Sequence, residues 1–127
     1  MADTKENIEK DVLFLYVSIS GREKGMVDNY AIIENYLMIR MPEEIDHHRA
    51  VLISRTADDY IAHSKIVNIV FDFEDTKFMD SSGIGVIMGR YKKISCFGGK
   101  VFAINTSRRI RQLLAVSGMQ KLITIME

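Results

Sequence analysis

Two adjacent serines, Ser81 and Ser82, follow Asp80 at the point where the sequence pattern changes from strand to helix. The first residues of a helix lie beside unpaired backbone amides and the positive end of the helix dipole. A serine in that position either caps the helix or provides a place for a phosphate group. The local sequence leaves both roles open.

Three glycines, Gly83, Gly85 and Gly89, fall in the first turns of the helix that follows the serines. Each costs about 1 kcal/mol relative to alanine inside a helix. A helix that accepts this cost must let something approach its backbone closely. A neighbouring helix, an incoming partner or a phosphate group would each explain the pattern.

The spacing around the serines does not match common catalytic or nucleotide-binding motifs. A nucleophile elbow needs glycine two residues before the serine, but Ser81 has Met79 there and Ser82 has Asp80. The sequence lacks the G-K-[ST] of a P-loop, and its glycine spacing is one residue too long for a dinucleotide fingerprint. We therefore predict no catalytic residue, no enzyme activity and no cofactor.

The histidines do not predict a metal site. His47 and His48 are adjacent, and adjacent residues on a helix face different directions. His63 lies far from them in the sequence, and the chain has a single cysteine, Cys96. We predict that no metal ion is bound.

Asp46 precedes a second predicted helix and is a good N-cap residue. Like Asp80, it stands where a strand pattern gives way to a helix pattern. Such junctions gather at one edge of a parallel sheet, where binding sites form. Asp46 is therefore predicted to lie near Ser81, although capping alone explains the residue equally well.

The composition indicates one globular domain of 127 residues with 17 basic and 17 acidic side chains. A net charge of zero argues against nucleic-acid binding through bulk positive charge. The longest apolar run, 12–17, is far shorter than the roughly 20 residues of a membrane helix. The polar, acidic start is unlike a secretory signal, and a single cysteine suits a reducing compartment. We expect a cytoplasmic protein that contacts neither membrane nor nucleic acid directly.

Strand and helix patterns alternate after an initial hairpin, which predicts an α/β fold. The predicted strands are 30–34, 36–41, 66–73, 101–104 and 122–126, and the predicted helices are 46–64, 82–97 and 108–118. Residues 12–19 fit a helix or a strand equally well, and Gly21 and Gly25 predict a break after them. The sheet should be mixed and mostly parallel, with about five strands flanked by helices.

Segment 78–92, with the sequence FMDSSGIGVIMGRYK, closely resembles the phosphorylation-site segment of anti-sigma factor antagonists with the STAS fold. Segment 45–48, Ile-Asp-His-His, resembles the acidic loop before their first helix. The resemblance covers about residues 30–127 and is nearest to the stage II sporulation branch, whose members oppose the anti-sigma F factor. It implies a STAS domain over residues 29–127 behind an N-terminal extension, residues 1–28.

The resemblance implies a regulator that is switched by its own partner. Unmodified family members bind an anti-sigma factor that is also a serine kinase, and this frees the sigma factor. The kinase phosphorylates the first serine of the pair, which ends binding, and a serine phosphatase reverses the change. Carried over, the phosphorylation site is Ser81, and the partner-binding residues are Asp46, Asp80, Ser81, Ser82, Gly83 and Gly85. The alternative is a STAS regulatory module that binds a nucleotide or anion at the same helix end.

The sequence departs from the family pattern at both ends and before the acidic loop. Residues 1–28 precede the family's first strand, and no final helix follows the last predicted strand; we predict that residues 1–28 pack where that helix would lie. Residues 42–44, Pro-Glu-Glu, replace the usual glycine before the acidic loop. This replacement is expected to alter the loop's shape and its affinity for a partner.

Overall fold

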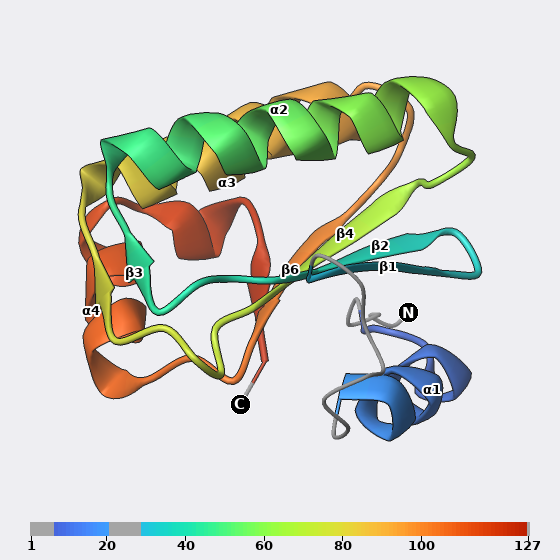
Figure 1. Cartoon of the computed structure of the whole chain (residues 1–127), viewed down its shortest axis with the longest axis horizontal. Coiled ribbons are helices and arrows are strands. Elements are labelled where there is room, and N and C mark those ends of the chain that lie inside the picture. Colours follow the sequence, from blue (N-terminus) through green and yellow to red (C-terminus); the bar gives the residue numbers. More distant parts are fainter. Residues whose placement is uncertain (1–6, 21–28, 127) are drawn as a thin grey trace.

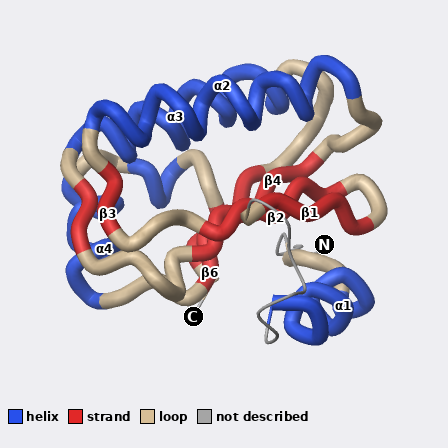
Figure 2. The backbone as a smooth tube through the Cα atoms, viewed as in Figure 1, coloured by secondary structure: helices blue, strands red, loops and turns tan. Residues whose placement is uncertain are grey.

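The computed structural model describes residues 7–20 and 29–126, which form three layers (Figure 1). Helices α2 and α3 cover one face of a central sheet, and α1 lies against the other face (Figure 2). The predicted α/β architecture is confirmed. The predicted break at Gly21 and Gly25 lies outside the described residues.

The elements follow one another in the order α1 (Lys10–Ser20), β1 (Tyr30–Ile33), β2 (Tyr36–Arg40), β3 (Glu44–Ile45), α2 (His47–His63), β4 (Asn68–Asp72), β5 (Phe78–Met79), α3 (Ser81–Ser95), β6 (Val101–Ile104), α4 (Arg108–Val116), a short 3-10 turn (Met119–Lys121) and β7 (Thr124–Ile125). Residues 12–19, which the sequence left undecided, are helical. The last strand is shorter than the predicted 122–126, because the amides of Leu122 and Ile123 donate hydrogen bonds back to the Met119 carbonyl and do not pair with β6. No helix in the described ranges combines the length and apolar character needed to cross a bilayer.

The main sheet is five-stranded, with the order β1-β2-β4-β6-β7. β1 and β2 form the predicted antiparallel hairpin, which turns at Glu34 and Asn35. The remaining pairings are parallel, and Val70 at the centre aligns with Met38 on one side and Phe102 on the other. β3 and β5 form a separate two-stranded parallel sheet, which the sequence did not predict.

Side chains alternate between the two faces of the central strands. Along β2, Leu37 and Ile39 pack with the α2 and α3 layer, whereas Tyr36 and Met38 pack with α1. β4 and β6 alternate in the same way. Because both faces are covered, these strands are apolar almost throughout, which is the pattern that made them recognisable in the sequence.

Candidate functional site

The small β3–β5 sheet places the starts of α2 and α3 side by side. Ile45 pairs with Met79, and the Asp80 amide donates a hydrogen bond to the Ile45 carbonyl at 3.2 Å. Asp46 and Asp80 are the next residues along the two chains. The structure therefore brings Asp46 and the serine pair to the same end of the molecule.

The two aspartates are the helix caps. The Asp46 Oδ1 accepts a hydrogen bond from the Arg49 amide at 2.9 Å, and the Asp80 Oδ1 accepts one from the Ser82 amide at 2.8 Å. The Ser82 hydroxyl also donates to Asp80 Oδ1, and Ser82 is half-buried. Capping, one of the two roles open to the serines, therefore belongs to Asp80.

Ser81 is the first residue of α3, and its side chain is exposed. Its hydroxyl has no hydrogen-bond partner among the described residues. The two serines thus differ physically, because the Ser82 hydroxyl is held by Asp80 whereas the Ser81 hydroxyl makes no such bond within residues 7–20 and 29–126. A group added to Ser81 would break no contact of the described structure.

Two of the first amides of α3 already have hydrogen-bond partners. The Ser82 amide bonds to the Asp80 carboxylate, and the Gly83 amide donates to the Asp80 carbonyl at 3.0 Å. A helix start attracts anions chiefly through unpaired amides. The amides of Ser82 and Gly83 are therefore not available to capture an anion at this end of α3.

Asp80 carries a stabilised negative charge. The hydroxyl and amide of Ser82 hold the pKa of the Asp80 carboxyl below its ordinary value, and the nearby His47 acts in the same direction. The contribution of a carboxylate with a lowered pKa is present at neutral pH and is lost only as the pH falls through that pKa. Asp80 is therefore ionised beside Ser81 under physiological conditions.

Gly83, one of the predicted partner-binding residues, is buried beneath the start of α3. A Cβ at this position would overlap the Met79 side chain and would lie 3.4 Å from Cγ2 of Ile45. The absence of a side chain lets α3 approach the β3–β5 sheet closely. Gly83 therefore sets how closely α3 packs against the β3–β5 sheet.

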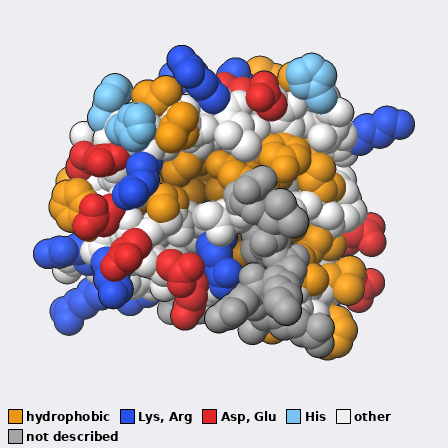
Figure 3. Space-filling model, viewed as in Figure 1, with side chains coloured by type: hydrophobic (Ala, Val, Ile, Leu, Met, Phe, Trp, Pro, Cys, Tyr) orange, Lys and Arg blue, Asp and Glu red, His pale blue; other side chains and the backbone are white. Residues whose placement is uncertain are grey.

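Gly85 is exposed and lies in a groove of about 400 Å³ between α2 and α3. Val51 and Arg55 line the α2 side of this groove, and Ser82 and Val86 line the α3 side together with Gly85. Acidic, basic and histidine side chains are interspersed over the end of the molecule where α2 begins (Figure 3). The groove thus adjoins the serine pair and has both apolar and charged walls.

Sequence reasoning missed a buried cation between the two helices. Arg90 is only 7% exposed, and its Nε lies 3.1 Å from Oδ1 of Asp58 on α2. Asp58 also pairs with Lys93 at 3.1 Å. The signal was present, because Arg90 lies one helical turn after the buried Val86 on the same stripe.

The described residues hold no group of three His, Cys, Asp or Glu side chains that could bind a metal ion.

The family model of the STAS domain matches residues 29–127. The anti-sigma F factor antagonist of Paenibacillus polymyxa is 36% identical over 89 residues, which are 70% of this chain and 76% of that protein.

Two solved structures have a similar fold and sequence. The anti-sigma factor antagonist SpoIIAA in its unphosphorylated form matches with a TM-score of 0.70 and 26% identity, over 77% of this chain and 86% of that one. The Bacillus cell fate determinant SpoIIAA in the phosphorylated form matches with a TM-score of 0.63 and 27% identity, over 76% and 87%. The chain therefore belongs to the STAS-domain anti-sigma factor antagonists, a family of non-enzymatic regulators.

Proposed function

We propose that this protein binds an anti-sigma factor that is also a serine kinase, and that phosphorylation of Ser81 by this kinase ends the binding. Binding of the unmodified form releases the sigma factor, and a serine phosphatase restores that form. We place this exchange in the cytoplasm, where sigma factors act. The observation that carries the proposal is the exposed hydroxyl of Ser81, which has no partner in the part of the chain that the structure describes and lies beside an aspartate that already caps the helix.

The similarity to SpoIIAA supports a phosphorylated and an unphosphorylated state. SpoIIAA has been solved in both forms, and both match this fold. Ser81 is exposed and its hydroxyl makes no hydrogen bond within the described residues. The modification would therefore leave the fold unchanged and act on binding.

The electrostatics explain how one phosphate would end binding. A phosphoserine carries close to two negative charges at neutral pH. At Ser81 it would adjoin the ionised Asp80, and the amides of Ser82 and Gly83 are already engaged. The phosphate would project into the partner interface, where like charges and lost solvation cost several kcal/mol.

The proposed docking face comprises exposed and half-buried residues around the two helix starts, together with the neighbouring groove. Asp46, Asp80, Ser81 and Ser82 form its rim, and Gly85 lies in the groove. Gly83 supports this face from beneath. The alternative of a nucleotide or anion site at the same helix end is weaker, because the amides of Ser82 and Gly83 are occupied.

Labelling by the kinase tests the assignment. The wild-type protein, incubated with ATP and its cognate kinase, should gain one phosphate, and tandem mass spectrometry should place it on Ser81. Ser81→Ala should gain none. Ser82→Ala is the matched control and should still be labelled, because Ser81 remains accessible. Label on Ser82, or on neither serine of the wild type, would refute the proposal.

Gly85→Ala tests the groove. We expect the substitution to stabilise the protein by up to about 1 kcal/mol, since it adds helix propensity and the new methyl group would meet nothing within 4 Å apart from the backbone of its own helix and its chain neighbours. The same methyl would reduce the space in the groove and weaken binding of the anti-sigma factor. Thermal melts and calorimetric titration measure the two effects.

Gly89→Ala is the control for that experiment. Its new methyl would also meet nothing within 4 Å, and Gly89 does not line the groove. The control should gain stability and keep full affinity. If both alanine variants bind as tightly as the wild type, the groove does not belong to the docking face.

A further inference from the structure

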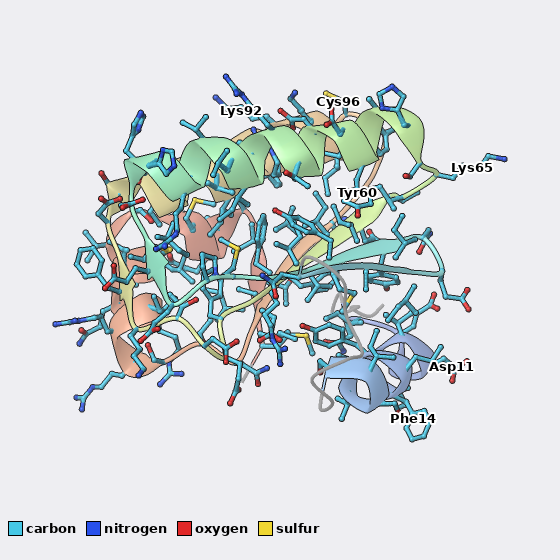
Figure 4. The ribbon with its side chains drawn as sticks, viewed as in Figure 1. Asp11, Phe14, Tyr60, Lys65, Lys92 and Cys96 are labelled. Carbon is cyan, nitrogen blue, oxygen red and sulfur yellow. The ribbon has the colours of Figure 1, made fainter. Side chains whose placement is uncertain are left out.

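Helix α1 packs on the second face of the sheet, outside the residues that match the STAS family. Val12 and Tyr16 are buried there against Met38, Val70 and Phe102. On the outer side of the helix the Phe14 side chain points away from the sheet (Figure 4). Apolar burial explains why α1 stays on the sheet, but α1 also makes polar contacts at one edge.

The first polar contact joins α1 to the end of β4. The Tyr16 hydroxyl donates a hydrogen bond to Oδ2 of Asp72 at 2.5 Å, and Asp72 is 2% exposed. Oδ1 of the same carboxylate accepts from the Glu74 amide at 3.0 Å and from Nδ2 of Asn105 at 2.9 Å. Burial, together with Asp72, raises the pKa of Tyr16, so the hydroxyl keeps its proton. Asp72 thus connects α1 directly to the first turn of the β4–β5 connection.

The second polar contact joins the last residue of α1 to the end of β2. Nη2 of Arg40 donates to the Ser20 carbonyl at 3.0 Å, and its Nε lies 3.4 Å from Oδ2 of Asp75 in the β4–β5 connection. Arg40 and Asp72 are paired in register on adjacent strands. Both contacts therefore lie at the carboxyl edge of the sheet.

The connections that leave this edge lead to the proposed docking face. From Arg40 the chain runs through β3 to Asp46, and from Asp72 it runs through β5 to Asp80 and Ser81. Hydrogen bonds tie the two connections together, among them one from the Lys77 amide to the Glu43 carbonyl at 2.8 Å. A displacement of the β4–β5 connection would therefore reach the start of α3.

We propose that α1 is a brace, which holds Asp72 through Tyr16 and Arg40 through Ser20 and so fixes the β4–β5 connection that positions Ser81. A buried carboxylate that loses one of its donors is left partly unsatisfied and must shift or admit water. Such a shift would weaken the hydrogen bond from the Glu74 amide to Asp72 and make the residues that follow Glu74 more mobile. The effect of the brace on partner binding rests on the proposed function, whereas its effect on the connection does not.

Tyr16→Phe tests the brace by hydrogen exchange. It removes only the hydroxyl, so exchange of the Glu74, Lys77 and Asp80 amides should become about fivefold faster or more. Tyr36→Phe is the matched control, because it removes a buried hydroxyl from the same cluster, one that accepts from the Glu9 amide instead. The control should leave these amides within about twofold of the wild type.

Equal exchange at these amides in the two phenylalanine variants would overturn the brace. Asp75→Asn provides a second variant that should fold normally, because the Asp75 side chain is 54% exposed. It removes the charge that attracts Arg40 and should also accelerate exchange at Lys77. Unchanged exchange would show that the contact between Arg40 and Asp75 does not hold the β4–β5 connection.

Binding to the kinase separates this inference from the proposed function. Tyr16→Phe should weaken binding about fivefold, and Tyr36→Phe should not change it. If the wild type does not bind the kinase, the proposed function fails, and the exchange rates still decide whether the brace exists. If the wild type binds and Tyr16→Phe binds equally well, α1 does not regulate the docking face.

Discussion

Ser81→Asp is expected to melt at the wild-type temperature and to lose about 100-fold of its affinity for the anti-sigma factor, a loss of about 2.7 kcal/mol. The unchanged stability follows from the exposure of Ser81 and from its hydroxyl, which makes no hydrogen bond within the described residues. The loss of binding follows from a second carboxylate beside the ionised Asp80 in a surface that docking would desolvate. Thermal melts and calorimetric titration with the purified partner measure both quantities.

Ser81→Asn separates charge from size, because asparagine matches aspartate in shape and carries no charge. This control should retain most of the affinity. Equal losses in the two variants would show that bulk at Ser81 controls docking, and full affinity in Ser81→Asp would contradict the electrostatic explanation.

Deletion of residues 1–28 is expected to destabilise the protein substantially. Ile8, Val12 and Tyr16 are each at least 97% buried, and full burial of a large apolar side chain contributes about 1.5–3 kcal/mol. The deletion would also expose Met38 and Phe102 on the sheet. After the entropy of ordering the helix is subtracted, a net loss of about 3 kcal/mol should lower the melting temperature by more than about 10 °C.

Calorimetry of the truncated and full-length proteins measures this loss. Deletion of residues 1–6 alone is the control and should leave the melting temperature unchanged, because it keeps the α1 contacts described above. An unchanged melting temperature after deletion of residues 1–28 would exclude a structural role for the segment. It would also contradict the prediction, so far untested, that residues 1–28 pack where the family's final helix would lie.

Local patterns were sufficient to predict most of the sheet and the two helix starts. β4 and β6 read as strands because both of their faces are buried. Asp46 was predicted to be a cap because a carboxylate satisfies the amides at a helix start, and the structure confirms it. At the second helix start the cap is Asp80, beside the serines to which the sequence left that role open. These features depend on neighbouring residues, which a single sequence displays directly.

The features that the sequence did not reveal depend on residues far apart in the chain. β3 and β5 are two residues each, too short for any periodicity, and each forms only by pairing with the other. Tyr16 and Asp72 are 56 positions apart. Residues 12–19 fitted a helix or a strand because nearly all of them are apolar, so that the sequence shows no clear period. In the structure they are helical, and one side of the helix packs on the sheet.

The most direct test compares the unmodified protein with the protein phosphorylated on Ser81, using calorimetric titration with the kinase and a melt of each form. We expect the phosphorylated form to bind at least about 100-fold more weakly and to melt within about 2 °C of the unmodified form. Equal affinity of the two forms would contradict the switch, and unfolding on phosphorylation would contradict the claim that Ser81 is structurally free.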